Sequence, residues 1–187
     1  PLCVAWGDRF VLRRYSPALS IGGGTVLDPH PHKHRRADGA TCKQLCSLES
    51  TDVQAVLEAL LRRDEDRLCA QRQLAATCAL SISEVGAILA ELHGLGRVLL
   101  SGPSGDQTTL HSDVASLWSD RIASSLADFH GEYPLRDGLR REELRQRSAR
   151  YIQSELFDWV LDQMEAVGRV EIRGSVVCLT GHSIEFS

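Results

Sequence analysis

The sequence has no long hydrophobic run and no excess of positive charge. Its 187 residues include 21 Lys and Arg against 25 Asp and Glu, a formal net charge of −4. The overall basic character of a dedicated nucleic-acid-binding protein is therefore absent. The apolar stretches are too short to span a bilayer, and no signal-peptide pattern opens the chain. We expect a cytoplasmic protein.

Catalytic motifs and a disulfide framework are missing as well. No Gly-x-Ser-x-Gly or His-Glu-x-x-His motif occurs, and the seven histidines form no recognisable arrangement with cysteine. We predict that this chain is not an enzyme. The six cysteines are scattered, whereas disulfide scaffolds are short and cysteine-dense. Cys78 and Cys178 fall in core-like positions, as reduced thiols acting as small hydrophobes do.

The sequence contains an internal repeat. Gly96-Arg97-Val98 recurs 72 residues later as Gly168-Arg169-Val170. Before each copy, apolar residues recur at the spacing of one buried helical face, and after it alternating residues around a turn predict a β-hairpin. The helical positions are Val85, Ile88, Leu89, Leu92 and Leu95 in the first copy, and Phe157, Val160, Leu161, Met164 and Val167 in the second.

Two more amphipathic segments precede each of these helices. The nearer one is short, at 72–79 and 141–147, and the earlier one is longer, at 51–63 and 113–130. Three helices and a terminal hairpin are the element order of a winged-helix module, and self-similarity at one period indicates tandem copies. We predict a mainly α chain with small β-hairpins (α+β class). Its winged-helix module 1 would span residues 48–111, and module 2 residues 112–187.

Residues 1–28 have the pattern of β-strands instead. Strands are expected at Val4–Trp6, Arg9–Arg13 and Ile21–Leu27. Three consecutive glycines in the last of them suit a bend, as at a barrel corner. Because three strands cannot close a barrel, we interpret residues 1–28 as terminal strands of a truncated β-barrel. The alternative is a free-standing three-stranded cap, which would be marginally stable at this size.

Residues 29–47 are expected to form a basic linker. Its cationic residues Lys33, Arg35 and Arg36 could contact RNA phosphates without regard to sequence. A solvated connector rich in proline and histidine is the plainer interpretation. A zinc site is the third, and its ligands would be His30, His32, His34, Cys42 and Cys46. A His-x-His-x-His run does not present ligands as a structural site does, and we expect no metal.

Each module's predicted third helix has acidic outward residues. DNA-binding winged helices place Arg, Lys, Asn or Gln on this helix, which enters the major groove. Here the outward positions are Glu84, Glu91 and His93 in module 1, and Glu155, Asp158, Asp162 and Glu165 in module 2. We predict that neither helix reads a groove.

Arginine is concentrated instead around the second helix of module 2. The residues are Arg136, Arg140, Arg141, Arg145, Arg147 and Arg150, against Asp137, Glu142 and Glu143. Charges three and four residues apart on a helix usually pair and form a solvated face. The alternative is an RNA-backbone contact through Arg136, Arg140, Arg141, Arg145 and Arg150.

Two stretches resemble the selenocysteine-specific translation elongation factors, the SelB family. Residues 7–36, GDRFVLRRYSPALSIGGGTVLDPHPHKHRR, are similar to the close of that family's third domain, a β-barrel followed by a basic linker and a string of winged-helix modules. A second match runs from Phe129-His130 through Pro134–Gly138 to Glu142–Arg145. It is similar to the segment between the first two helices of the family's second module.

The resemblance implies a C-terminal arm that links a GTPase and tRNA-binding part to an mRNA-hairpin-binding end during selenocysteine incorporation at UGA codons. The implied partners are selenocysteinyl-tRNA, the selenocysteine-insertion hairpin, the ribosome and other domains of the same parent. GTP and Mg would belong to a missing N-terminal part, since no G-x-x-x-x-G-K-S/T phosphate loop occurs here. Family members usually continue with two further modules, so we expect a fragment.

Two other classes of function remain open. A winged-helix DNA-binding transcriptional regulator should have basic third helices, which this sequence does not predict. A winged-helix protein-interaction module should expose an apolar patch on one module.

Overall fold

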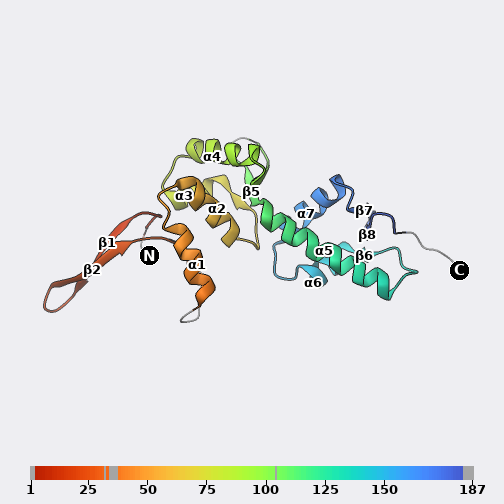
Figure 1. Cartoon of the computed structure of the whole chain (residues 1–187), viewed down its shortest axis with the longest axis horizontal. Coiled ribbons are helices and arrows are strands. Elements are labelled where there is room, and N and C mark those ends of the chain that lie inside the picture. Colours follow the sequence, from red (N-terminus) through yellow and green to blue (C-terminus); the bar gives the residue numbers. More distant parts are fainter. Residues whose placement is uncertain (1–2, 32, 34–37, 104, 183–187) are drawn as a thin grey trace. The chain divides into compact units, whose positions relative to one another are not determined.

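The computed structural model describes residues 3–31, 33, 38–103 and 105–182 (Figure 1). The chain divides into two compact units. Unit 1 comprises Pro1–Asp64 and Cys69–Thr109, and unit 2 comprises Glu65–Leu68 and Leu110–Ser187. Each unit contains three helices and a small antiparallel sheet in the winged-helix order, and unit 1 also holds a further helix and a two-stranded hairpin, which confirms the predicted fold class.

The winged helix of unit 1 is built around a fully apolar centre. Its helices are α2 (Val53–Arg63), α3 (Gln71–Cys78) and α4 (Ile82–Gly94), and its strands are β3 (Cys69–Ala70), β4 (Val98–Ser101) and β5 (Thr108–His111). The last two residues of β5 belong to unit 2. The sheet order is β3-β5-β4. Val56 and Leu57 of α2 are wholly buried with Val85, Leu89 and Leu92 of α4, as the helical spacing predicts.

Capping residues fix where α2 and α4 begin. Asp52 accepts a hydrogen bond from the backbone N–H of Gln54 at 3.0 Å. Ser81 and Glu84 form a reciprocal capping box, in which each side chain accepts from the other's backbone N–H, at 3.2 and 2.9 Å. These bonds satisfy donors that the first turn of a helix leaves unpaired.

The N-terminal segment differs from its prediction in two places. Strands β1 (Arg9–Arg14) and β2 (Leu19–Thr25) form an antiparallel hairpin, but no strand forms at Val4–Trp6. Trp6 is instead hydrogen-bonded to the rest of unit 1. Its backbone N–H donates to the Thr77 carbonyl of the winged helix (2.8 Å), and its indole N–H donates to the Leu48 carbonyl (2.9 Å).

The second difference is a helix inside the expected linker. Helix α1 (Gly39–Leu48) occupies the end of the 29–47 segment. Its Leu48 is 1% exposed, and Leu45 packs against the same core. The helix forms because these two leucines, one turn apart, gain burial against the winged helix.

An ion-pair cluster attaches the base of the hairpin to α2. The Nη1 of Arg63 lies 2.7 Å from Asp28, and its Nε lies 2.9 Å from Asp64. Burial lowers the pKa of Arg63, but the hydrogen bonds and charges of Asp64 and Asp28 outweigh burial and raise it. The pairs offset the cost of removing these charges from water.

Unit 2 repeats the winged-helix arrangement. Its helices are α5 (Ser112–Glu132), α6 (Arg141–Ser148) and α7 (Ser154–Ala166), and its strands are β6 (Leu139–Arg140), β7 (Val170–Arg173) and β8 (Val176–Leu179). The sheet order is β6-β8-β7, and the turn of the predicted hairpin contains Gly174 at φ +65°. Phe129, Phe157 and Leu161 fill the core at 2% exposure or less.

The repeated Gly-Arg-Val motif has the same structural role in both units. Gly96 (φ +70°) and Gly168 (φ +71°) adopt the left-handed conformation that ends a helix. The arginine that follows then pairs with a carboxylate on the first helix of its own module. Arg97 pairs with Glu58 of α2, and Arg169 lies 2.9 Å from Asp120 of α5.

None of the described helices is long and apolar enough by itself to cross a membrane. Helices α3 and α4 reach the required length and composition only when counted together, and a 114° bend separates them.

Gly138 is predicted to be essential for the sheet of unit 2. A Cβ at this position would overlap the Val177 carbonyl oxygen and lie 2.9 Å from the carbonyl carbon. The variant Gly138→Ala should therefore lower the free energy of unfolding by about 1–3 kcal/mol, as overpacking does. The control Gly131→Ala, with open space around the added methyl, should cost nothing. Urea unfolding followed by circular dichroism measures both, and equal midpoints would contradict the prediction.

His130 predicts a pH dependence of the stability of unit 2. Its Nε2 accepts from the Leu179 N–H at 3.3 Å and its ring stacks on His182. Burial and the charge of His182 lower the pKa of His130. Below an unfolded-state pKa of about 6.5 the unfolded chain therefore binds the proton more readily, and stability is lost as the pH falls.

Urea unfolding can be followed through Trp118 and Trp159, which belong to unit 2. The midpoint should be lower at about pH 5.5 than at about pH 7.5, and His130→Gln should reduce the difference. An identical pH dependence in the variant would show that another group is responsible.

Candidate nucleic-acid interface

The third helix of each winged helix carries acidic residues at its surface, as predicted. Glu84 and Glu91 of α4 are exposed, and so are Glu155, Asp162 and Glu165 of α7. Hydrogen bonds from the side chain and backbone of Ser81 lower the pKa of Glu84 and keep it ionised. Negative charge along these helices repels phosphate, so neither helix has the electrostatics of a groove-reading helix.

Three of the arginines around α6 are paired with carboxylates. Arg145 makes a forked contact with Glu142 at 3.1 and 2.9 Å, and Arg147 lies 3.2 Å from Glu143. These two pairs have the three- and four-residue spacing of a solvated helix face. Arg141 reaches across to Asp158 of α7 at 2.8 Å. A phosphate would have to displace a carboxylate to bind any of the three.

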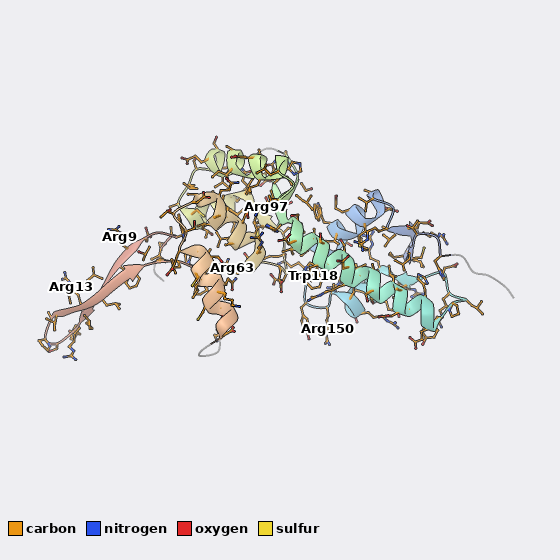
Figure 2. All side chains as sticks on the ribbon, viewed as in Figure 1. Arg9, Arg13, Arg63, Arg97, Trp118 and Arg150 are labelled. Atoms are coloured by element: carbon orange, nitrogen blue, oxygen red, sulfur yellow. The ribbon has the colours of Figure 1, made fainter. Side chains whose placement is uncertain are left out.

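The other three candidate arginines have no carboxylate partner among the described residues. Arg136, Arg140 and Arg150 are all exposed. The guanidinium of Arg136 lies 5.0 Å from the ring centre of Tyr133, and that of Arg150 lies 6.0 Å from the ring of Tyr151. Figure 2 labels Arg150, in the turn that follows α6. These side chains can therefore donate to a phosphate without first breaking an ion pair.

The candidate residues of the linker are only partly described. Lys33 is exposed, whereas Arg35 and Arg36 lie outside the described residues, as do His32 and His34 of the possible zinc site. Within the described part of the chain, no three His, Cys, Asp or Glu residues are arranged to hold a metal ion. Cys42 and Cys46 are exposed free thiols on α1.

Two surface features were not predicted from the sequence. Arg9 and Arg13 project from β1 (Figure 2), on a hairpin whose described residues are all exposed. Tyr133 and Tyr151 are 37% and 85% exposed, each beside an unpaired arginine. The sequence does contain a signal for the exposed Tyr151. The pair Arg150-Tyr151 interrupts the pattern of apolar residues between two predicted helices.

Comparisons with known proteins agree with the predicted resemblance. Residues 123–179 match the family described as "Elongation factor SelB, winged helix". A selenocysteine-specific elongation factor of Desulfomicrobium baculatum is 22% identical over 197 residues, and the alignment covers all of this chain but 29% of that protein. The chain thus spans less than a third of the length of this relative.

A solved structure is also similar. It is the mRNA-binding domain of elongation factor SelB from E. coli in complex with SECIS RNA, with a TM-score of 0.48 and 15% identity. The match covers 70% of this chain and 99% of that one. The resemblance to the SelB family is confirmed. The matched family is a winged-helix domain rather than a GTPase domain, in agreement with the prediction that this chain is not an enzyme.

Proposed function

We propose, from its relation to the selenocysteine-specific elongation factors, that this chain acts as the C-terminal arm of such a factor. It would link a GTPase and tRNA-binding part to the end that holds the mRNA hairpin. The observation that carries this proposal is the similarity along the whole chain to a selenocysteine-specific elongation factor. The cytoplasm, selenocysteinyl-tRNA, the selenocysteine-insertion hairpin and the ribosome are the location and partners that follow from it.

The exposed hairpin is evidence for a larger β-domain before the winged helices. Phe10, Val11, Leu12, Leu19 and Ile21 are 42–69% exposed, and a two-stranded hairpin is marginally stable alone. Its open edges also invite pairing with further strands. We infer that β1 and β2 complete a barrel supplied by the rest of the parent protein, as the domain order of residues 1–28 and 29–47 predicts.

The contacts at the base of the hairpin suit a mechanical link. Trp6 bonds to two backbone carbonyls of unit 1, and Asp28 pairs with Arg63. The Thr77 carbonyl and Arg63 belong to the winged helix formed by α2, α3 and α4, whereas the Leu48 carbonyl belongs to α1, which packs on the same core. A barrel held in this way would transmit its orientation to the first module, which a free linker would not do.

The arm would bind RNA weakly, through contacts with the phosphate backbone of the RNA. The candidate residues remain Lys33, Arg35, Arg36, Arg136, Arg140, Arg141, Arg145 and Arg150, and those without ion pairs are the better placed. Contacts of this kind carry no sequence information and weaken steeply with salt. The acidic α4 and α7 would limit adventitious binding elsewhere on the two modules.

Fluorescence anisotropy tests this proposal with a selenocysteine-insertion hairpin and a scrambled hairpin, each at low and near-physiological salt. We expect weak binding that falls with salt and does not distinguish the two RNAs. Tight binding selective for the insertion hairpin would overturn the linking role, because these modules would then read the message themselves.

A triple variant locates the contact. Replacing Arg136, Arg140 and Arg150 by Gln should lower the slope of log affinity against log salt by about 2–3, since each lost phosphate contact removes nearly one unit. Arg62, Arg72 and Arg173 provide the control, because all three are paired with carboxylates. Replacing them by Gln removes the same charge and should change the slope little. Equal effects would mean that only total charge matters.

A further inference from the structure

Two exposed aromatic rings lie beside the unpaired arginines of unit 2. Tyr151 is 85% exposed in the turn between α6 and α7, and Tyr133 is 37% exposed at the end of α5. Neither ring contributes to the core in the way that Phe129 and Phe157 do. Each has a guanidinium over or beside it, from Arg150 and Arg136.

The turn that carries Arg150 and Tyr151 is anchored on both sides. Ala149 and Ile152 are 1% and 3% exposed, so the residues flanking the pair are buried. The N–H of Ala149 donates to the Arg145 carbonyl at 2.8 Å, and that of Gln153 donates to the Asp66 carbonyl at 3.0 Å. The backbone is therefore fixed while the two side chains between the anchors face solvent, which reduces the entropy lost when they bind a ligand.

The second tyrosine–arginine pair, Tyr133 and Arg136, is held at the C-terminal end of α5. The N–H of Tyr133 donates to the Phe129 carbonyl at 2.8 Å, and its ring lies 5.2 Å from the ring of Phe129. The N–H of Arg136 donates in turn to the Tyr133 carbonyl at 3.0 Å. Arg147 lies over the Phe129 ring as well, at 5.4 Å, so this end of α5 combines aromatic rings with two guanidinium groups.

A tyrosine beside a guanidinium is suited to one part of a nucleic acid in particular. Unpaired bases stack on aromatic side chains and on arginine planes, whereas a duplex already stacks its bases and hides their faces. Arginine alone binds the phosphates of either form. The tyrosines therefore add a preference for single-stranded segments, loops and bulges that charge cannot supply.

We propose that the second winged helix binds unpaired RNA bases by stacking them on Tyr151 and Tyr133, with Arg150 and Arg136 holding the adjoining phosphates. The preferred ligand is a single-stranded or bulged RNA segment of no fixed sequence. This inference rests on the proposed RNA contact and specifies its ligand class. Tyr151 is the principal platform because almost all of its ring is free.

The test compares one RNA oligonucleotide as a single strand with the same strand annealed to its complement, using fluorescence anisotropy and the full chain. The wild-type protein should prefer the single strand by roughly tenfold, the scale of one stacked base. Tyr151→Ala should lose most of that preference, and Tyr151→Phe should keep it because the ring is retained. Tyr133→Ala should have a smaller effect and requires a check of its thermal stability, since Tyr133 touches Phe129.

Tyr15 supplies the matched control, because it is 100% exposed on the hairpin between β1 and β2 with no arginine contact among those described. Tyr15→Ala should leave the preference unchanged. Equal wild-type affinity for both forms of RNA, or an unchanged preference in Tyr151→Ala, would overturn the stacking inference. If the arginine variant still loses salt-dependent binding in that case, the proposed backbone contact stands. Absence of binding to either RNA at low salt would overturn both.

Discussion

The junction between third helix and hairpin is the constraint on which each winged helix depends. At this point the chain must leave a buried helix and begin a strand within a few residues. A glycine at positive φ makes the reversal, and the next residue, Arg97 or Arg169, pairs with an acid on the first helix. Glu58 is only 6% exposed, and a buried carboxylate without such a partner would be costly. In unit 1 this motif thus joins the third helix, the hairpin and the first helix, whereas the matching Arg169–Asp120 pair of unit 2 is exposed to solvent.

The same arrangement determines where a partner can bind. The helix that meets phosphate in DNA-binding relatives of this fold is acidic in both units, and the arginine of the junction is occupied internally. Around α6, the described arginines that have no carboxylate partner are Arg136, Arg140 and Arg150. In unit 2, the charges therefore favour the proposed nucleic-acid contact near the second helix over one at the third.

Periodicity made most of the fold predictable, because long elements repeat their pattern several times. The exceptions are short. Strands β3 and β6 have two residues each, which is too few to show alternation, and they form because β5 and β8 offer an open edge. Helix α1 has only Leu45 and Leu48 facing the core. The missing strand at Trp6 reflects two hydrogen bonds to unit 1 that no local pattern encodes. In the site, spacing predicted the pairs of Arg145 and Arg147 but not that of Arg141 with Asp158. The exposure of Tyr151 depends on buried neighbours on either side.

A surface that combines stacking with a few free arginines has a physical advantage for an arm that works among RNA. Phosphate contacts lose affinity as salt displaces them, but the stacking of a base on a tyrosine releases no counterions and persists. At physiological salt, stacking therefore contributes a larger share of the binding free energy than it does at low salt. The surface then favours RNA with unpaired bases. Acidic residues such as Glu155 and Asp162 on α7 act in the same direction, because they oppose a purely electrostatic complex. Abundant duplex RNA would then be held weakly and would not trap the proposed arm.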